Sequence, residues 1–532
     1  MKFRQLPVVA VMGALALPLL AQIAIGQQAP APAPAATPAA AAAGRGAGGP
    51  GRGPNPQAQM FTARCAGCHG ADLAGARAPS LFRTDFLASR TDAQLHQTIV
   101  DGIPGADMPS FKGQISDEDI GQLLTYIRLQ SGNLKGTAPF VPDPNGQIIK
   151  SAKQTFRIEI VASGLDTPWG QAFLPDGRLL VTERSGQIRI IDKDGKLSPN
   201  PVKGTPVPWV RQDGGYFDIA IHPDYKKNGW IYLSYSEIVP GYTGPIPAAN
   251  APRPPPGTPV TPLPPSMTHL VRGHINANNE WVDQQDVYQA PAALYTPTII
   301  HYGSRFLFDG KGHLFWTQGE RGEMTNAQNL SVPLGKIHRI NDDGSVPSDN
   351  PFVNLAGADP TIWTYGHRNP EGLSIDPRSG LLWESEHGPT GGDEINIIEK
   401  GKDYGWGVAS MGTQPGITRQ HAPMMVDPIA YYTPSIGPSG IAFNIGNKYP
   451  GWKNNLFVSA LIGQKLLRLE VDGRKVVSQE TLFDQFGRVR DVTLGPDGLL
   501  YVLVQNPTGR GTAVPVMSAA APGVVMRLVP VN

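Results

Sequence analysis

The chain has 532 residues, too many for one compact hydrophobic core, so we expect two or more domains. Its formal net charge of +1 and its 17% of charged residues argue against nucleic acid or an anionic membrane as the main partner. The 62 glycines and 53 prolines are many for a helical protein and favour a turn-rich β architecture.

Residues 1–26 have the pattern of a secretory signal peptide. Lys2 and Arg4 give a basic start, an apolar stretch covers residues 6–20, and small residues follow. Because the apolar stretch is short and is broken by Pro18, a signal peptide is favoured over an uncleaved membrane anchor. We therefore predict an exported protein, periplasmic or secreted, with no stable membrane span in its mature form.

A small domain is predicted for residues 57–133, after an Ala/Pro/Gly-rich linker at residues 27–56. It contains both cysteines of the chain, in the pentapeptide Cys65-Ala66-Gly67-Cys68-His69. This C-x-x-C-H pattern is typical of haem c: Cys65 and Cys68 would form the thioethers and His69 would bind the iron. A redox disulfide or half of a zinc site is less favoured, because the chain lacks a second ligand pair and a βαβ context.

The second axial ligand of the haem iron is predicted to be Met108. It follows a Gly/Pro loop, Gly102-Ile103-Pro104-Gly105, that allows a close approach to the iron. The alternative is a methionine of the hydrophobic core.

Two helices are expected around this loop. Thr91 would cap one, and Ser116, with Asp119 three residues on, would cap a second whose apolar face continues to Ile127 and which ends near Gly132. With these features, Gln57 to Ser131 resembles a class I cytochrome c, which implies a small all-α domain that carries one electron on a His/Met-ligated haem.

The large domain is predicted for residues 151–532, after a second linker at residues 134–150. An apolar strand, a turn with Pro-Asp, Asp-Gly or a similar pair, and a second apolar strand recur in six copies: 171–183, 218–236, 305–319, 372–386, 441–461 and 491–505. Such repetition predicts a six-bladed β-propeller, so the fold class is mainly β with a small all-α domain in front. A two-sheet sandwich is the alternative.

The stretch from Tyr365 to Ile398 carries more candidate chemistry than any other. Arg368 and Asn369 offer a guanidinium and an amide at the start of a strand, where they would bind a planar ligand rich in carboxylates. Gly388 and Pro389 open a glycine-rich acidic loop, and their carbonyl oxygens could hold a hard cation. A structural ion pair in a propeller turn is the alternative for Arg368.

Two further segments supply polar residues near strand starts. His301 precedes the third repeat, and Arg488 and Arg490 share one face if their segment is extended. Taken with GHRNPEG and HGPTGGDE, these segments resemble the soluble aldose and glucose dehydrogenases that depend on pyrroloquinoline quinone (PQQ), over residues 155–530.

The resemblance implies a role for each of these residues. His301 would be the base that deprotonates the sugar hydroxyl. Arg368, Asn369, Arg488 and Arg490 would contact PQQ. Gly388 and Pro389 would bind Ca²⁺ through their carbonyls.

The chain also departs from the glucose dehydrogenases. Ile300 replaces an Asp before the base, Ile462 stands where a cofactor-binding Lys is expected, and either Gln212 or Asp213 is the counterpart of a Gln. These changes favour the broader aldose dehydrogenase branch and leave the substrate open.

The function hypothesis is an exported quinohaemoprotein that oxidises an aldose, or a related sugar alcohol or aldehyde, to a lactone or acid. A two-electron quinol must be reoxidised one electron at a time, and a tethered haem supplies a nearby acceptor. The partners of the protein would be a sugar and a downstream electron acceptor, and nucleic acid would not be one of them. A sorbosone-type aldehyde dehydrogenase and a non-catalytic ligand-binding propeller are the alternatives.

Overall fold

The computed structural model describes residues 56–69, 81, 92–103, 108–134, 143–247, 262–389, 391–414, 416–433, 435–462, 464–505 and 523–531. The predicted signal peptide, all but the last residue of the predicted 27–56 linker, and the capping residue Thr91 lie outside these ranges.

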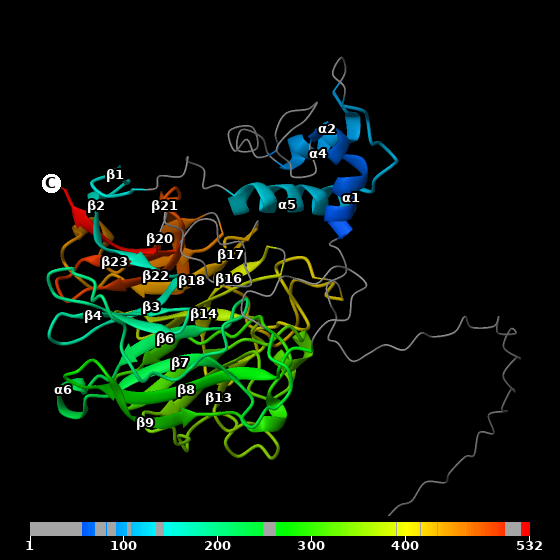
Figure 1. Ribbon diagram of the computed structural model, residues 1–532. Helices are drawn as coiled ribbons and strands as arrows, with labels where there is room; N and C mark the ends of the chain where they lie inside the picture. The colour runs from blue at the N-terminus through cyan, green and yellow to red at the C-terminus, as the bar shows by residue number, and fades with distance from the viewer. Residues whose placement is uncertain are drawn as a thin grey trace, which may run out of the picture. The chain divides into compact units, whose positions relative to one another are not determined.

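The described strands form six sheets, which are the blades of a propeller (Figure 1). In chain order the first five are β3 (Pro168–Phe173), β4 (Leu179–Glu183) and β5 (Gln187–Ile191); β6 (Tyr216–Ile221), β7 (Ile231–Ile238), β8 (Ser266–Ile275) and β9 (Trp281–Tyr288); β10 (Phe306–Phe308), β11 (His313–Gln318), β12 (Lys336–Asn341) and β13 (Ile362–Tyr365); β14 (Pro370–Ile375), β15 (Leu382–Glu386), β16 (Asp393–Ile398) and β17 (Ala430–Tyr432); and β18 (Pro438–Phe443), β19 (Leu456–Ala460), β20 (Lys465–Asp472) and β21 (Lys475–Phe483).

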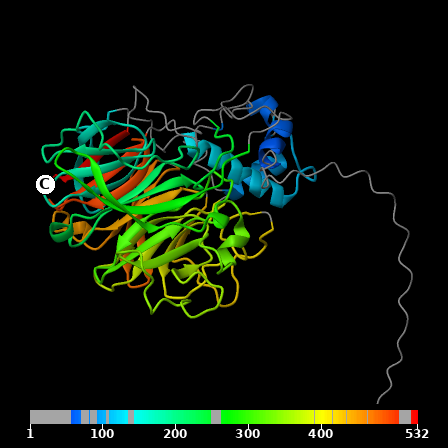
Figure 2. The ribbon, with the colours of Figure 1, turned by 60° about the horizontal axis from the view of Figure 1, so that its bottom comes forward.

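The sixth blade closes the ring by joining the two ends of the domain. It combines β22 (Arg488–Leu494), β23 (Leu500–Gln505) and β24 (Gly523–Pro530) with β2 (Thr155–Leu165) and β1 (Ile148–Lys150). β2 pairs antiparallel with β24, and Figures 1 and 2 show this cyan strand beside the red C-terminal strands. β1 falls within residues 134–150 and extends this sheet by one strand.

The first strands of the six blades form the inner ring. β3, β6, β10, β14, β18 and β22 contact one another in this order, and β22 contacts β3. Each predicted repeat is the first hairpin of one blade, so the six-bladed propeller is confirmed and the two-sheet sandwich is wrong.

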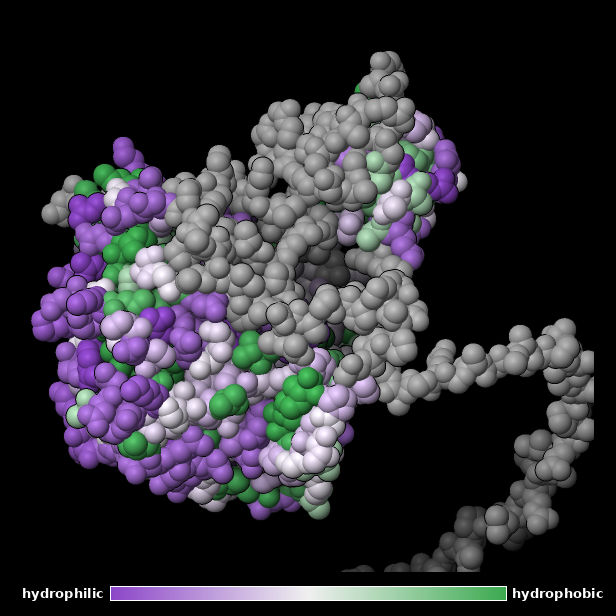
Figure 3. All heavy atoms as spheres, viewed as in Figure 1, coloured by the Kyte–Doolittle hydropathy of each residue, from purple (hydrophilic) through white to green (hydrophobic). Residues whose placement is uncertain are grey.

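The hydrophobic core lies between neighbouring blades. Trp383 and Ile395 of the fourth blade, for example, pack against Phe443 and Val458 of the fifth. Strands buried on both faces need apolar residues at nearly every position, as the repeats have. The described surface in Figure 3 is accordingly mostly hydrophilic, with scattered hydrophobic residues.

The inner strands share an irregularity near their starts. In five of the six blades the register between the first and second strands shifts there, for example between Val489 and Asp491. β-Bulges of this kind redirect side chains and are common beside active sites. Two of these strand ends, at the starts of β14 and β22, carry the predicted PQQ contacts Arg368, Asn369, Arg488 and Arg490.

The helical region comprises α1 (Pro56–Arg64), α2 (Ala66–His69), α4 (Asp92–Asp101) and α5 (Asp117–Leu134). The Asp119 amide donates to Ser116 Oγ at 3.1 Å, which confirms the predicted cap of α5. Ile120, Leu123 and Ile127 of α5 are buried against Phe61 of α1. Among the described residues, no helix is both long and apolar enough to span a bilayer.

Candidate active site

His301 lies at the start of the third blade with its ring held by a carboxylate. Its Nδ1 lies 2.6 Å from Glu320 Oε2, and its side chain is only 13% exposed. Glu320 follows β11, whereas His301 precedes β10, so the antiparallel pairing of these strands brings the two side chains together. Sequence reasoning missed Glu320, because nothing in its local sequence marks it as the partner of a residue 19 positions earlier.

The backbone around His301 is also fixed. His301 adopts a positive φ of 54°, and its amide donates to Asp213 Oδ2 at 3.1 Å. Arg321 donates to the carbonyl oxygens of Ile300 and Thr298. A left-handed conformation is costly for a non-glycine residue and persists where the surroundings impose it, most often at functional sites.

The protonation states follow from burial and from the neighbouring charges. Burial lowers the pKa of His301, the Glu320 carboxylate opposes this shift, and Arg368 adds to it. Burial alone would raise the pKa of Glu320, but His301 and Arg368 bring it below its usual value. An ionised Glu320 can only accept, so the neutral imidazole carries its hydrogen on Nδ1 and its lone pair on Nε2.

These shifts predict the acid limb of the pH profile of any reaction that uses His301 as a base. A base at His301 would be lost as pH falls through its lowered pKa, so activity should persist below about pH 6.5, the ordinary histidine value, before it declines. Glu320→Gln removes the charge that raises this pKa, so the acid limb should move to lower pH while turnover drops. Stopped-flow rates across pH would measure both effects. An unmoved limb in Glu320→Gln would contradict the pairing.

Arg368 and Asn369 connect the His301 segment to the fourth blade. The Arg368 carbonyl accepts from the Glu320 amide at 2.9 Å. Asn369 Oδ1 accepts from the Gly303 amide at 3.0 Å, and its Nδ2 donates to Glu371 Oε1 at 3.0 Å. The predicted base and the predicted arginine motif are therefore brought together.

Arg488 and Arg490 lie on the inner strand β22. Arg490 Nη1 donates to Glu371 Oε2 at 2.5 Å, and its guanidinium lies 5.3 Å from the Trp169 ring. Burial and then Arg490 lower the pKa of Arg488 to about 9. The register of β22 against β23 shifts between Val489 and Asp491, at Arg490. The rule that residues two apart on a strand point to the same face therefore does not apply to Arg488 and Arg490. The two positive charges still affect each other.

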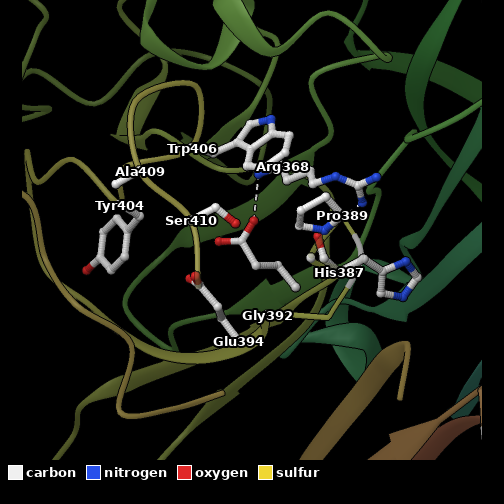
Figure 4. Close-up of a pocket in the computed structure, with 11 residues that line it drawn as sticks. Arg368, His387, Pro389, Gly392, Glu394, Tyr404, Trp406, Ala409 and Ser410 are labelled. Carbon is white, nitrogen blue, oxygen red and sulfur yellow. Dashed lines mark hydrogen bonds between the residues drawn. The ribbon is translucent and has the colours of Figure 1, made fainter. Parts of the chain in front are cut away.

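A pocket beside Arg368 contains the predicted calcium ligands. Its empty space, open solvent included, is about 240 Å³, and Figure 4 shows the Glu394 carboxylate and Ser410 facing its interior. Its lining comprises Arg368, Glu386, His387, Gly388, Pro389, Gly392, Glu394, Tyr404, Trp406, Ala409 and Ser410.

Oxygen atoms crowd around this loop. A Cβ on Gly388 would lie 2.3 Å from Gly391 O and 2.4 Å from Gly392 O, so only glycine fits. No backbone amide of the described residues donates to the carbonyl oxygen of Gly388 or Pro389. Glu386 and Glu394 add carboxylates to the same pocket. Such a donor set fits a hard divalent cation, which prefers oxygen ligands.

Deeper in the fourth blade, His367, Glu384 and Glu386 offer ligand atoms within 4.8 Å of one another, and sequence reasoning missed this cluster too.

Three of the residues at which the sequence is expected to differ from the glucose dehydrogenases, Gln212, Asp213 and Ile462, have different surroundings. Asp213 accepts a hydrogen bond from the His301 amide, so of the two candidate counterparts it is the one in direct contact with His301. Gln212 precedes it with a positive φ of 52°. Ile462 packs near Gly437 and contributes no cation.

In the helical region, the predicted haem ligands lie on short, locally defined segments. The His69 amide donates to the Cys65 carbonyl at 2.9 Å, so the motif forms a helical turn that includes Cys68. The Met108 carbonyl accepts from the Ile103 amide at 3.1 Å, and the Met108 side chain is only partly buried beside the helical core. Part of the loop before Met108 lies outside the described residues.

Met108→Ala should leave haem covalently attached while it lowers the reduction potential, since the thioether ligand raises the potential of haem c. Reduction of the haem by sugar should slow, whereas oxidation with a dye acceptor that bypasses the haem should persist. Redox titration followed by visible spectroscopy measures the potential, with Met60→Ala as the matched methionine control. An unchanged potential would remove Met108 from the ligand set.

The fold is a six-bladed propeller with a buried His301–Glu320 pair and arginines beside its inner ring, and comparison with known proteins assigns it to the sugar dehydrogenase class of oxidoreductases. The model of the glucose/sorbosone dehydrogenase family matches residues 165–514, and that of the cbb3-type cytochrome c oxidase subunit III matches residues 54–127. The chain belongs to the family of PQQ-dependent aldose sugar dehydrogenases and carries a cytochrome c domain in front of the propeller.

Individual relatives agree with this assignment. The aldose sugar dehydrogenase of Escherichia coli is 37% identical over 368 residues, which are 68% of this chain and 92% of the relative. The apo structure of the soluble E. coli enzyme matches 71% of this chain and 100% of its own, with 33% identity and a TM-score of 0.61. The PQQ-bound aldose sugar dehydrogenase of Streptomyces coelicolor matches 73% and 100%, with 25% identity and a TM-score of 0.53.

Proposed function

We propose that the protein oxidises an aldose, or a related sugar alcohol or aldehyde, to a lactone or acid, using PQQ and Ca²⁺ and passing the electrons to its own haem c. The observation that carries this proposal is the pairing of His301 with Glu320 beside Arg368, because it combines a base with cations for an anionic cofactor. The family's relatives support the reaction class.

The residues fit PQQ, a flat tricarboxylate. Arg490 Nε is buried without a hydrogen-bond partner among the described residues, as expected where a ligand supplies the acceptor. Arg368, Arg488 and Arg490 supply positive charge for its carboxylates, and Asn369 supplies an amide. The carbonyls of Gly388 and Pro389 would hold Ca²⁺.

The chain's own residues account for the proton and the orientation of the sugar. His301 Nε2 takes the proton of a sugar hydroxyl group while hydride departs from the carbon that bears this group. The C–O bond then becomes the C=O double bond of the oxidised sugar. Glu320 stabilises the imidazolium that forms. When bound, PQQ would supply the hydride acceptor, with Ca²⁺ as a Lewis acid. Cys65, Cys68, His69 and Met108 would hold haem c, which would supply a one-electron acceptor within the same chain.

We further propose export to the periplasm or beyond, on the basis of residues 1–26, and an external carrier that reoxidises the haem.

The test uses the purified full chain, supplied with PQQ and Ca²⁺. Addition of an aldose should reduce the haem, as followed in its visible bands, only when PQQ is present. A panel of sugars and aldehydes with a dye acceptor distinguishes an aldose from a sorbosone-type substrate. Samples without sugar control for spontaneous haem reduction. PQQ-loaded protein that reduces neither dye nor haem with any sugar would contradict the proposal.

A further inference from the structure

Arg184 is a buried arginine next to the site that no sequence motif singles out. It lies in the turn between β4 and β5, where its amide donates to Thr167 O at 3.1 Å and its carbonyl accepts from the Tyr216 amide at 3.3 Å. A Cβ on Gly215 would lie 2.0 Å from the Arg184 carbonyl oxygen, so this close approach requires glycine. The first and second blades therefore fix the backbone of Arg184.

The side chain of Arg184 has no protein partner among the described residues. It is 9% exposed, its Nε is buried without a hydrogen bond, and its guanidinium forms no ion pair there. Arg189, two strand positions into the same hairpin, is different: it pairs with Glu183 at 3.2 Å and donates to Ser198 O at 3.0 Å. A buried guanidinium without partners is costly, so its environment calls for an anion.

The charges around Arg184 are unbalanced. Burial lowers its pKa to about 10, an effect that Asp213, Asp166 and Glu371 oppose and Arg490 reinforces. Arg488 is affected by both Arg490 and Arg184. The nearby carboxylates already have partners, since Glu371 accepts from Arg490 and Asp213 accepts from the His301 amide. The charges of Arg184, Arg488 and Arg490 thus affect one another, and among the described residues no acceptor is hydrogen-bonded to the Arg184 side chain.

We propose that Arg184 binds a carboxylate of the cofactor, so that blade one contributes to the PQQ site together with Arg488 and Arg490. This inference rests on the proposed function. A guanidinium suits the task because its planar fork meets a carboxylate with two parallel hydrogen bonds. The anion would also relieve the repulsion among the three arginines.

The experiment measures PQQ binding by the PQQ-free full chain, by fluorescence titration in the presence of Ca²⁺. Arg184→Gln should raise the Kd by about 10- to 100-fold, the usual worth of a hydrogen bond to a charged group. Arg184→Lys keeps the charge but loses the two parallel donors, so its Kd for PQQ should lie between those of the wild type and Arg184→Gln. Arg178→Gln is the matched control, since Arg178 lies at the other end of β4 and pairs with Asp176.

Thermal unfolding separates binding from a structural role. Without PQQ, Arg184→Gln should unfold at the same temperature as the wild type or higher, because one of three like charges is gone, and PQQ should raise its Tm less. A lower Tm without PQQ, combined with an unchanged Kd, would overturn the inference and make Arg184 structural. If the wild-type chain itself does not bind PQQ, the proposed function fails, and the inference fails with it.

Discussion

His301→Ala is expected to lower the turnover of sugar oxidation by about two to four orders of magnitude, the usual contribution of a positioned general base. The effect should appear in kcat at saturating PQQ, because the imidazole takes the hydroxyl proton only as hydride leaves. Haem content should be unchanged, since Cys65 and Cys68 belong to a different part of the chain. Stopped-flow oxidation of an aldose with a dye acceptor measures the loss.

Two variants control for this result. His421→Ala removes an exposed histidine that pairs with Asp427, and it should keep normal turnover. Arg490→Ala should weaken PQQ binding and recover partly at high PQQ, because it removes a carboxylate partner rather than the base. Near-normal turnover of His301→Ala would show that the base is misassigned, and Asp213, which contacts the His301 amide, would be tested first.

The features of this protein that were predictable from sequence are those encoded locally. Each repeat places two apolar strands around a turn, and this local signal was enough to predict six hairpins and hence six blades. Ser116 and Asp119 lie three residues apart, so the cap of α5 could also be predicted.

The partners of the site residues could not be predicted, because they depend on tertiary contacts. Glu320 meets His301 across a strand pair, and Glu371 meets Arg490 from another blade. Arg184 had no motif at all. The resemblance of four short segments to one family supplied the roles that residue spacing could not. At Arg490 the register shifts, so the alternation of side chains along a regular strand does not predict the direction of this residue.

Removal of calcium should abolish sugar oxidation without affecting the haem. Prolonged incubation of the PQQ-loaded chain with a chelator is expected to lower activity by about two or more orders of magnitude, because a Lewis acid contributes several kcal/mol to such a step. Ca²⁺ should restore the activity, and the visible spectrum of the haem should stay constant. Mg²⁺ should restore less, since it demands a stricter geometry than a loop of backbone carbonyls provides.

A variant of Gly388 locates the ion, since carbonyl ligands cannot be deleted by changing side chains. In Gly388→Ala the new methyl group meets Gly391 O at 2.3 Å, so the loop must open and the calcium concentration needed for half-maximal activity should rise at least about tenfold. Gly380→Ala, in the same blade, strains a backbone with a φ of 71° but has no atom within 4 Å of the new Cβ, so it controls for a general loss of stability and should keep the wild-type calcium requirement. Chelator-resistant activity in the wild type, or an equal calcium requirement in Gly388→Ala, would place the ion elsewhere, and the neighbouring cluster of His367, Glu384 and Glu386 would be the next group to test.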